Sequence, residues 1–131
     1  MQLALKIFAL LLALIFFALG LSAFIDPATA LVGPAFAWLP DGIAGLSAGR
    51  GILGGQYLAL GLVSAYALTK KEYKLLYVPA LSEFMIVVGR LVSLGVDGFD
   101  ERTLVPMLVE MVIAVGMFCA AKFLRPQTVE I

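Results

Sequence analysis

Four long apolar stretches constrain the fold of this chain more than any other feature of its sequence. They run from about Leu3 to Ile25, Gly51 to Leu68, Leu75 to Val96 and Leu104 to Phe123. Each stretch is close to the roughly 17–25 residues that a helix needs to cross a bilayer. Because backbone groups cannot face lipid without internal hydrogen bonds, we expect helices. The sequence predicts an all-α integral membrane four-helix bundle, with one transmembrane domain over residues 1–131.

The composition agrees with a membrane protein and argues against several functional classes. Hydrophobic residues make up 63% of the chain and charged residues 14%. Soluble domains have about 45–50% and about 25%. Nine basic residues balance nine acidic ones, so we expect no nucleic-acid partner. The absence of His and the single Cys argue against a metal site, a cofactor and paired-thiol redox chemistry.

The basic residues of the connections predict the orientation in the membrane, because Lys and Arg are in excess on the cytoplasmic side. One side would hold Lys6, Lys70, Lys71, Lys74, Lys122 and Arg125. The other side would hold Arg50, Arg102 and most of the acidic residues. We therefore expect a multi-pass protein of the bacterial inner (cytoplasmic) membrane, with both termini in the cytoplasm.

The segment from Asp26 to Gly49 is the longest connection between the apolar stretches. Its Asp26-Pro27 pair favours a helix start, with Asp as the cap and Pro in the first turn. Phe36, Trp38 and Leu39 suit the headgroup region, where Trp is enriched. We expect a short interfacial or re-entrant segment between helices one and two. A hydrophobic loop packed on the bundle is the alternative.

Three charged side chains, Glu83, Arg90 and Glu110, lie inside stretches that are otherwise apolar. A charge at the bilayer centre costs about 2.5–3.5 kcal/mol, so it is normally paired, turned inward or functional. Glu83 and Arg90 are seven residues apart and share one face of the third helix. Helices two and four run the opposite way, which brings Gln56 and Glu110 to the depth of Arg90. We predict that these three side chains meet at one level.

This polar cluster has two interpretations. Arg90 and Glu110 form a structural ion pair, or they line a ligand-binding cluster together with Gln56 and Arg50. Arg50 alternatively extends to the membrane interface, as long basic side chains do. Glu83 has no base at its own depth. It is held as the neutral acid, reaches Arg90, or meets a partner protein.

Glycines on the second helix predict close helix packing. Gly54, Gly55 and Gly61 lie among other small residues, and small residues let membrane helices approach closely. The run from Arg50 to Tyr57 is not a phosphate-binding loop, because it lacks the Gly-Lys-Ser/Thr ending and follows no strand.

Two motifs of the chain resemble those of the bacterial domain-of-unknown-function 4345 family. The first is Arg50-Gly51-x-x-Gly54-Gly55-Gln56-x-x-x-Leu60-Gly61. The second is Glu83…Gly89-Arg90-x-x-Ser93-x-Gly95-x-Asp97-Gly98, followed by Glu110 in the fourth helix. The resemblance extends over nearly the whole chain, with the first helix similar in character only. It implies a small four-helix membrane protein, and it implies no particular activity.

Three functional hypotheses follow from these features. The first is an accessory or structural subunit, or an interaction partner, in a larger membrane complex. The second is a small-molecule or lipid binder or carrier, in which the Arg/Glu/Gln cluster takes a small apolar or anionic ligand. The third, a membrane enzyme, is disfavoured because the sequence has no nucleophile–base pair, metal cluster or cofactor motif.

Overall fold

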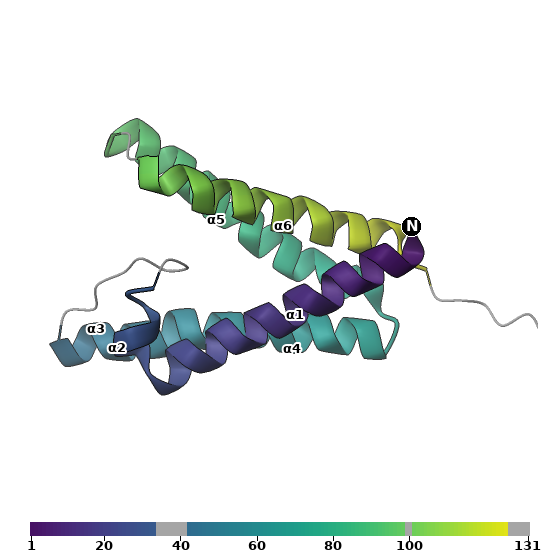
Figure 1. Ribbon diagram of the computed structural model, residues 1–131, viewed down its shortest axis with the longest axis horizontal. Helices are drawn as coiled ribbons and strands as arrows, with labels where there is room; N and C mark the ends of the chain where they lie inside the picture. Colours follow the sequence, from purple (N-terminus) through teal and green to yellow (C-terminus); the bar gives the residue numbers. More distant parts are fainter. Residues whose placement is uncertain (34–41, 99–100, 126–131) are drawn as a thin grey trace, which may run out of the picture. The chain divides into compact units, whose positions relative to one another are not determined.

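The computed structural model describes residues 1–33, 42–98 and 101–125, apart from the side chain of Arg102. In chain order its elements are α1 (Gln2–Ile25), α2 (Pro27–Ala30), α3 (Gly42–Ala48), the π-helix η1 (Gly49–Gly54), α4 (Gly55–Thr69), the 3₁₀ helix η2 (Tyr73–Leu76), α5 (Tyr77–Val96), the 3₁₀ helix η3 (Glu101–Thr103) and α6 (Leu104–Phe123) (Figure 1). The described residues contain helices and no strand, which confirms the all-α class.

Four helical spans are long and apolar enough to cross a membrane, as the sequence predicts. They are Gln2–Ile25, Gly42–Thr69, Tyr73–Val96 and Leu104–Phe123. The aromatic residues expected in the headgroup region, Phe36 and Trp38, lie outside the described residues together with Leu39.

The second span begins earlier than predicted. The expected start was about Gly51, whereas α3, η1 and α4 form one helical run from Gly42 to Thr69. From the sequence, the glycines of this stretch were expected to interrupt the helix, because each costs about 1 kcal/mol in a helix relative to Ala. In a membrane an unsatisfied backbone group costs more than that, so the helix continues through them.

A capping Asp, a first-turn Pro and a Gly with positive φ lie at helix ends, where the sequence would place them. The Asp26 carboxylate accepts a hydrogen bond from Thr29 N at 3.3 Å, with Pro27 in the first turn, so the predicted helix start is confirmed as α2. Pro79 lies in the first turn of α5, where its missing N–H is not needed. At the other end of α5, Gly98 has a φ of +101°, a conformation that favours glycine and stops the helix.

The chain divides into two compact units. One contains Met1–Ala9 and Tyr66–Ile131, and the other contains Leu10–Ala65. The prediction of a single transmembrane domain therefore stays a prediction.

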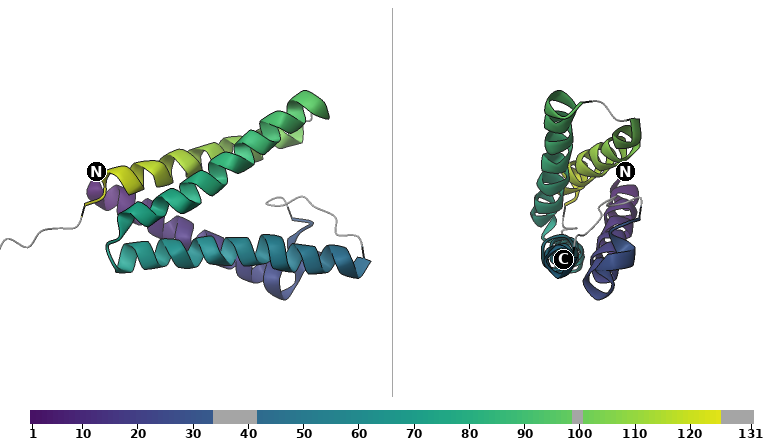
Figure 2. Two further views of the ribbon diagram at one scale, coloured as in Figure 1. Left: turned by 180° about the vertical axis from the view of Figure 1, so that it is seen from behind. Right: turned by 90° about the vertical axis from the view of Figure 1, so that its left-hand side faces the viewer.

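The first unit is built on the antiparallel pair α5 and α6, which lie side by side (Figures 1 and 2). Buried positions recur in steps of three and four on both sides of this pair. They are Leu76, Ala80, Glu83 and Val87 along η2 and α5, and Glu110, Ala114, Met117 and Ala121 along α6. This is the heptad spacing of a coiled-coil seam. Gln2 Nε2 joins the first turn of α1 to the end of α6 by donating to Phe123 O at 2.6 Å.

In the second unit, α1 crosses the run formed by η1 and α4 (Figure 1), and glycines bring the two backbones close together. A Cβ at Gly61 would lie 2.7 Å from Phe17 N, and one at Gly54 would lie 2.9 Å from Phe24 N. A Cβ at Gly20 would overlap Leu58 N on the facing helix. These are contacts that only glycine permits, since the atoms that a side chain would meet are backbone.

Candidate functional site

Arg90 and Glu110 form a bidentate ion pair between α5 and α6. Arg90 Nε donates to Glu110 Oε2 at 2.6 Å, and Arg90 Nη2 donates to Glu110 Oε1 at 2.7 Å. The two side chains are 27% and 11% exposed. Such fork-to-fork geometry is the strongest form of the arginine–carboxylate pair. Both carboxylate oxygens of Glu110 are thus engaged within the chain.

Glu83 lies on the same seam, two helical turns from Arg90. Its residue surface is only 1% exposed, and among the described residues its Oε1 has no hydrogen-bond partner. Arg90 and Glu110 both lie within electrostatic range of it. The three side chains hold two carboxylates and one guanidinium. Because the guanidinium is engaged with Glu110, the carboxyl of Glu83 is the surplus acid of the cluster.

Arg50 is occupied at the end of another helix. Its Nε donates to Phe24 O at 2.8 Å. Phe24 O is one of the last carbonyls of α1, and these carbonyls accept no hydrogen bond from within the helix. A cation at this position also complements the negative end of the helix dipole. Gly54, one turn further along, lets the backbone of Phe24 approach. Arg50 and Gly54 together therefore fix the C-terminal end of α1.

The structure thus assigns the predicted site residues to two places. Glu83, Arg90 and Glu110 belong to the α5–α6 seam, whereas Arg50 and Gln56 belong to the unit that contains most of α1. The predicted common level of Gln56 with the ion pair stays a prediction.

The glycines predicted to pack helices behave differently from one another. Gly54 and Gly61 contact the α1 backbone, but a Cβ at Gly55 would meet nothing within 4 Å. The packing role expected of Gly55 therefore finds no contact in the described chain. The reason is that Gly55 follows Gly54 by one residue, about 100° around the helix, and so points away from α1. Gly20 was missed, although it lies seven residues after Ala13, a spacing that places both small residues on one face of α1.

An apolar groove on the outer side of α5 and α6 was also missed. Its volume is about 510 Å³, and it is lined by Tyr77, Ala80, Leu81, Phe84, Met111, Ala114, Val115 and Phe118. The charged residues in the chain gave no sign of this groove, which exists because Ala80 and Ala114 are small. No charged residue lines the groove, so it is separate from the ion pair.

Comparison with known proteins assigns the chain to a family. The family model described as "Domain of unknown function (DUF4345)" matches residues 4–121. This range overlaps all four helical spans that are long and apolar enough to cross a membrane. The chain belongs to the DUF4345 family. No curated protein and no solved structure matches this DUF4345 chain. Within its described residues, no group of three or more His, Cys, Asp or Glu side chains lies close enough to hold a metal ion.

Proposed function

We propose that this DUF4345 chain is an accessory or structural subunit of a larger complex in the bacterial inner membrane, with both termini in the cytoplasm. The closed ion pair between Arg90 and Glu110 carries the proposal. Glu110 accepts from Arg90 with both of its oxygens, so each of these two charges already has its counter-charge within the chain and needs none from a ligand. The pair then holds α5 against α6 and has no catalytic role.

Beside the paired Arg90 and Glu110, the described membrane-spanning helices offer mainly apolar surface to their surroundings. On α1, large side chains such as Leu10 and Leu14 are 50% and 58% exposed. Such a face fits either lipid or the helix of another subunit. In membranes, helix association depends on packing and hydrogen bonding, because lipid is as apolar as the helices. A partner helix with small residues would complement this bulky face.

Site-specific photocrosslinking in native membranes tests the proposal. A photoreactive residue at Leu14, which is 58% exposed, reports on the outer face of α1, and one at Ala13, which is 3% exposed, is the adjacent buried control. At native expression level we expect Leu14 to crosslink to one distinct polypeptide and Ala13 to give no such product. Crosslinks to lipid or to copies of the same chain alone, together with migration as a monomer or homo-oligomer in mild detergent, would contradict the proposal.

The second candidate function is a small-molecule binder or carrier, and Glu83 is the observation that favours it. A buried carboxyl oxygen without a partner is uncommon in folded proteins, because leaving it unsatisfied costs about 1–3 kcal/mol. A ligand with a hydrogen-bond donor or a positive charge would satisfy it. Ligand-induced thermal stabilisation, or transport in vesicles, would then be lost in Glu83→Gln and altered in Arg90→Gln. Unchanged behaviour in both variants would rule out this function.

A further inference from the structure

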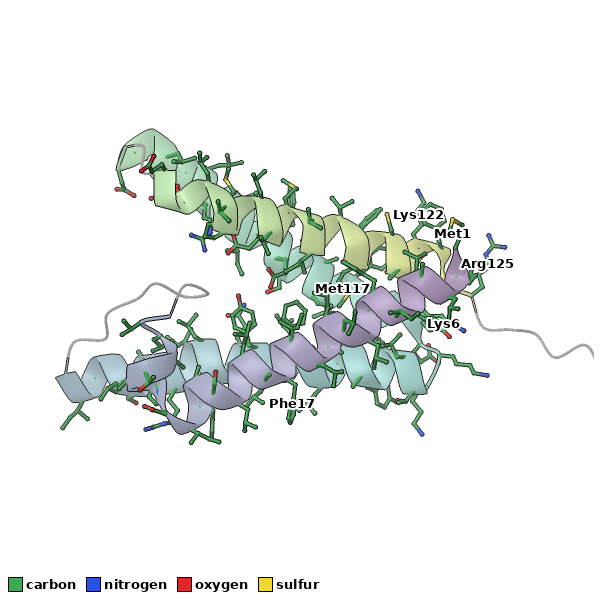
Figure 3. The ribbon with its side chains drawn as sticks, in the orientation of Figure 1. Met1, Lys6, Phe17, Met117, Lys122 and Arg125 are labelled. Carbon is green, nitrogen blue, oxygen red and sulfur yellow. The ribbon has the colours of Figure 1, made fainter. Side chains whose placement is uncertain are left out.

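The apolar groove between α5 and α6 ends at a pair of lysines. On α6, Met111, Val115 and Phe118 line the groove, and Lys122 continues the same stripe four residues later. Lys74 lies in η2, directly before α5, and precedes Tyr77 by three residues. Both lysines are exposed. Figure 3 shows Lys122 at the C-terminal end of α6, with Arg125 beside it.

The shape of the groove suits one hydrocarbon chain. Ala80 and Ala114, each 5% exposed, form its floor. Bulkier side chains such as Leu81, Phe84 and Val115 stand up as walls and are 62%, 47% and 53% exposed. From Tyr77 to Phe84 the groove is about 10 Å long at 1.5 Å per residue. This length fits inside one leaflet, whose hydrocarbon layer is about 15 Å deep.

The end of the groove near the lysines has the features of a membrane interface. The rings of Tyr77 and Phe118 meet edge to face at 5.3 Å between centroids. Tyr is enriched at the headgroup level, where its ring is in lipid and its hydroxyl in water. The ammonium of Lys122 lies 5.4 Å from the centroid of the Phe123 ring. Around this end, the described basic residues outnumber the one described carboxylate, Glu72; they are Lys6, Lys70, Lys71, Lys74, Lys122 and Arg125.

We propose that this groove binds an anionic phospholipid, with one acyl chain between α5 and α6 and the phosphate on Lys74 and Lys122. The charge of the two lysines selects the occupant. An uncharged face would take any lipid or a helix, whereas two cations at the mouth of an apolar groove favour a molecule with an acyl chain and a negative head. The proposal does not depend on the accessory role, because it concerns a different surface from the ion pair.

Native mass spectrometry of the purified full chain tests the charge requirement, with phosphatidylglycerol compared with phosphatidylcholine. We expect wild type to bind phosphatidylglycerol about 30-fold more tightly, from about 1 kcal/mol for each lysine near the surface. Lys74→Gln/Lys122→Gln should remove the preference. Lys70→Gln/Lys71→Gln loses the same charge at the same end of the protein, at residues that do not continue the stripes lining the groove, and should keep the preference. An absent preference in wild type, or its equal loss in both double variants, would overturn the proposal.

Filling the groove tests the acyl-chain part of the site. Val115→Trp places a large ring in the groove, while Val112→Trp makes the same change at a position that is 63% exposed and outside the lining. Val115→Trp should reduce binding of both lipids at least tenfold, and Val112→Trp should leave it unchanged. Equal binding by both variants would overturn the proposal. A dimer that Val115→Trp dissociates would also overturn it, because the groove would then belong to a second copy.

Discussion

Replacement of Gly61 by Ala should destabilise the contact between α1 and α4. The new Cβ would lie 2.7 Å from Phe17 N and 3.0 Å from Ala13 O, against the 3.4 Å at which ordinary contact begins. Because both atoms are backbone, the clash is relieved only if the helices separate, by about 0.7 Å. A gap of about 0.5–1 Å forfeits a quarter to a half of each dispersion contact that it opens. Overpacking of this kind costs roughly 1–3 kcal/mol.

Gly55→Ala is the matched control, since nothing lies within 4 Å of its Cβ position. Both substitutions gain the same helix propensity, about 1 kcal/mol, so the difference between them isolates the packing term. In SDS titrations from mixed micelles, the unfolding free energy of Gly61→Ala should be about 1–3 kcal/mol below that of Gly55→Ala. Equal unfolding free energies for the two variants would refute the close backbone contact.

Substitutions at two further residues test the charged side chains. Arg50→Gln should lower the unfolding free energy by about 0.3–1 kcal/mol and increase hydrogen exchange at the C-terminal end of α1, because the donor to Phe24 O is lost. Arg50→Lys keeps the charge and should keep part of the stabilisation. Unchanged exchange in both variants would contradict the capping role. Glu83→Gln should leave the unfolding free energy within about 1 kcal/mol of wild type, because a neutral side chain of the same size removes the surplus acid. Glu83→Lys should lower the unfolding free energy by about 3 kcal/mol or more, since it buries a cation beside Arg90. Similar unfolding free energies for the two variants would contradict the burial of this carboxyl beside Arg90.

The sequence predicts the helical class and most of the spans because the bilayer requirement acts on each segment alone. A run of about twenty apolar residues has one stable form in lipid whatever its neighbours are. The predicted start of the second span was wrong for a related reason. Glycine at Gly45, Gly49 and Gly51 weakens a helix in water, but the membrane removes the alternative of a solvated backbone.

Contacts between helices are less accessible to sequence reasoning. The seven-residue spacing of Glu83 and Arg90 places both on one face, and the structure has both on the α5–α6 seam. The hydrogen bond from Arg50 to Phe24 O could not be predicted, because it depends on where α1 ends in space. The groove depends on which alanines of the seam form a floor between two bulkier rows of side chains, and no charged residue lines it.

Arg90 and Glu110 satisfy each other and hold α5 against α6, and a double-mutant cycle measures this coupling. Arg90→Met and Glu110→Leu should each lower the unfolding free energy by about 2–3 kcal/mol, below the full cost for a buried pair because Arg90 is 27% exposed. The double variant should lose less than about 1 kcal/mol, since an apolar pair is as stable in that place. Additive losses in the double variant would contradict the claim, because they would show two charges that act independently.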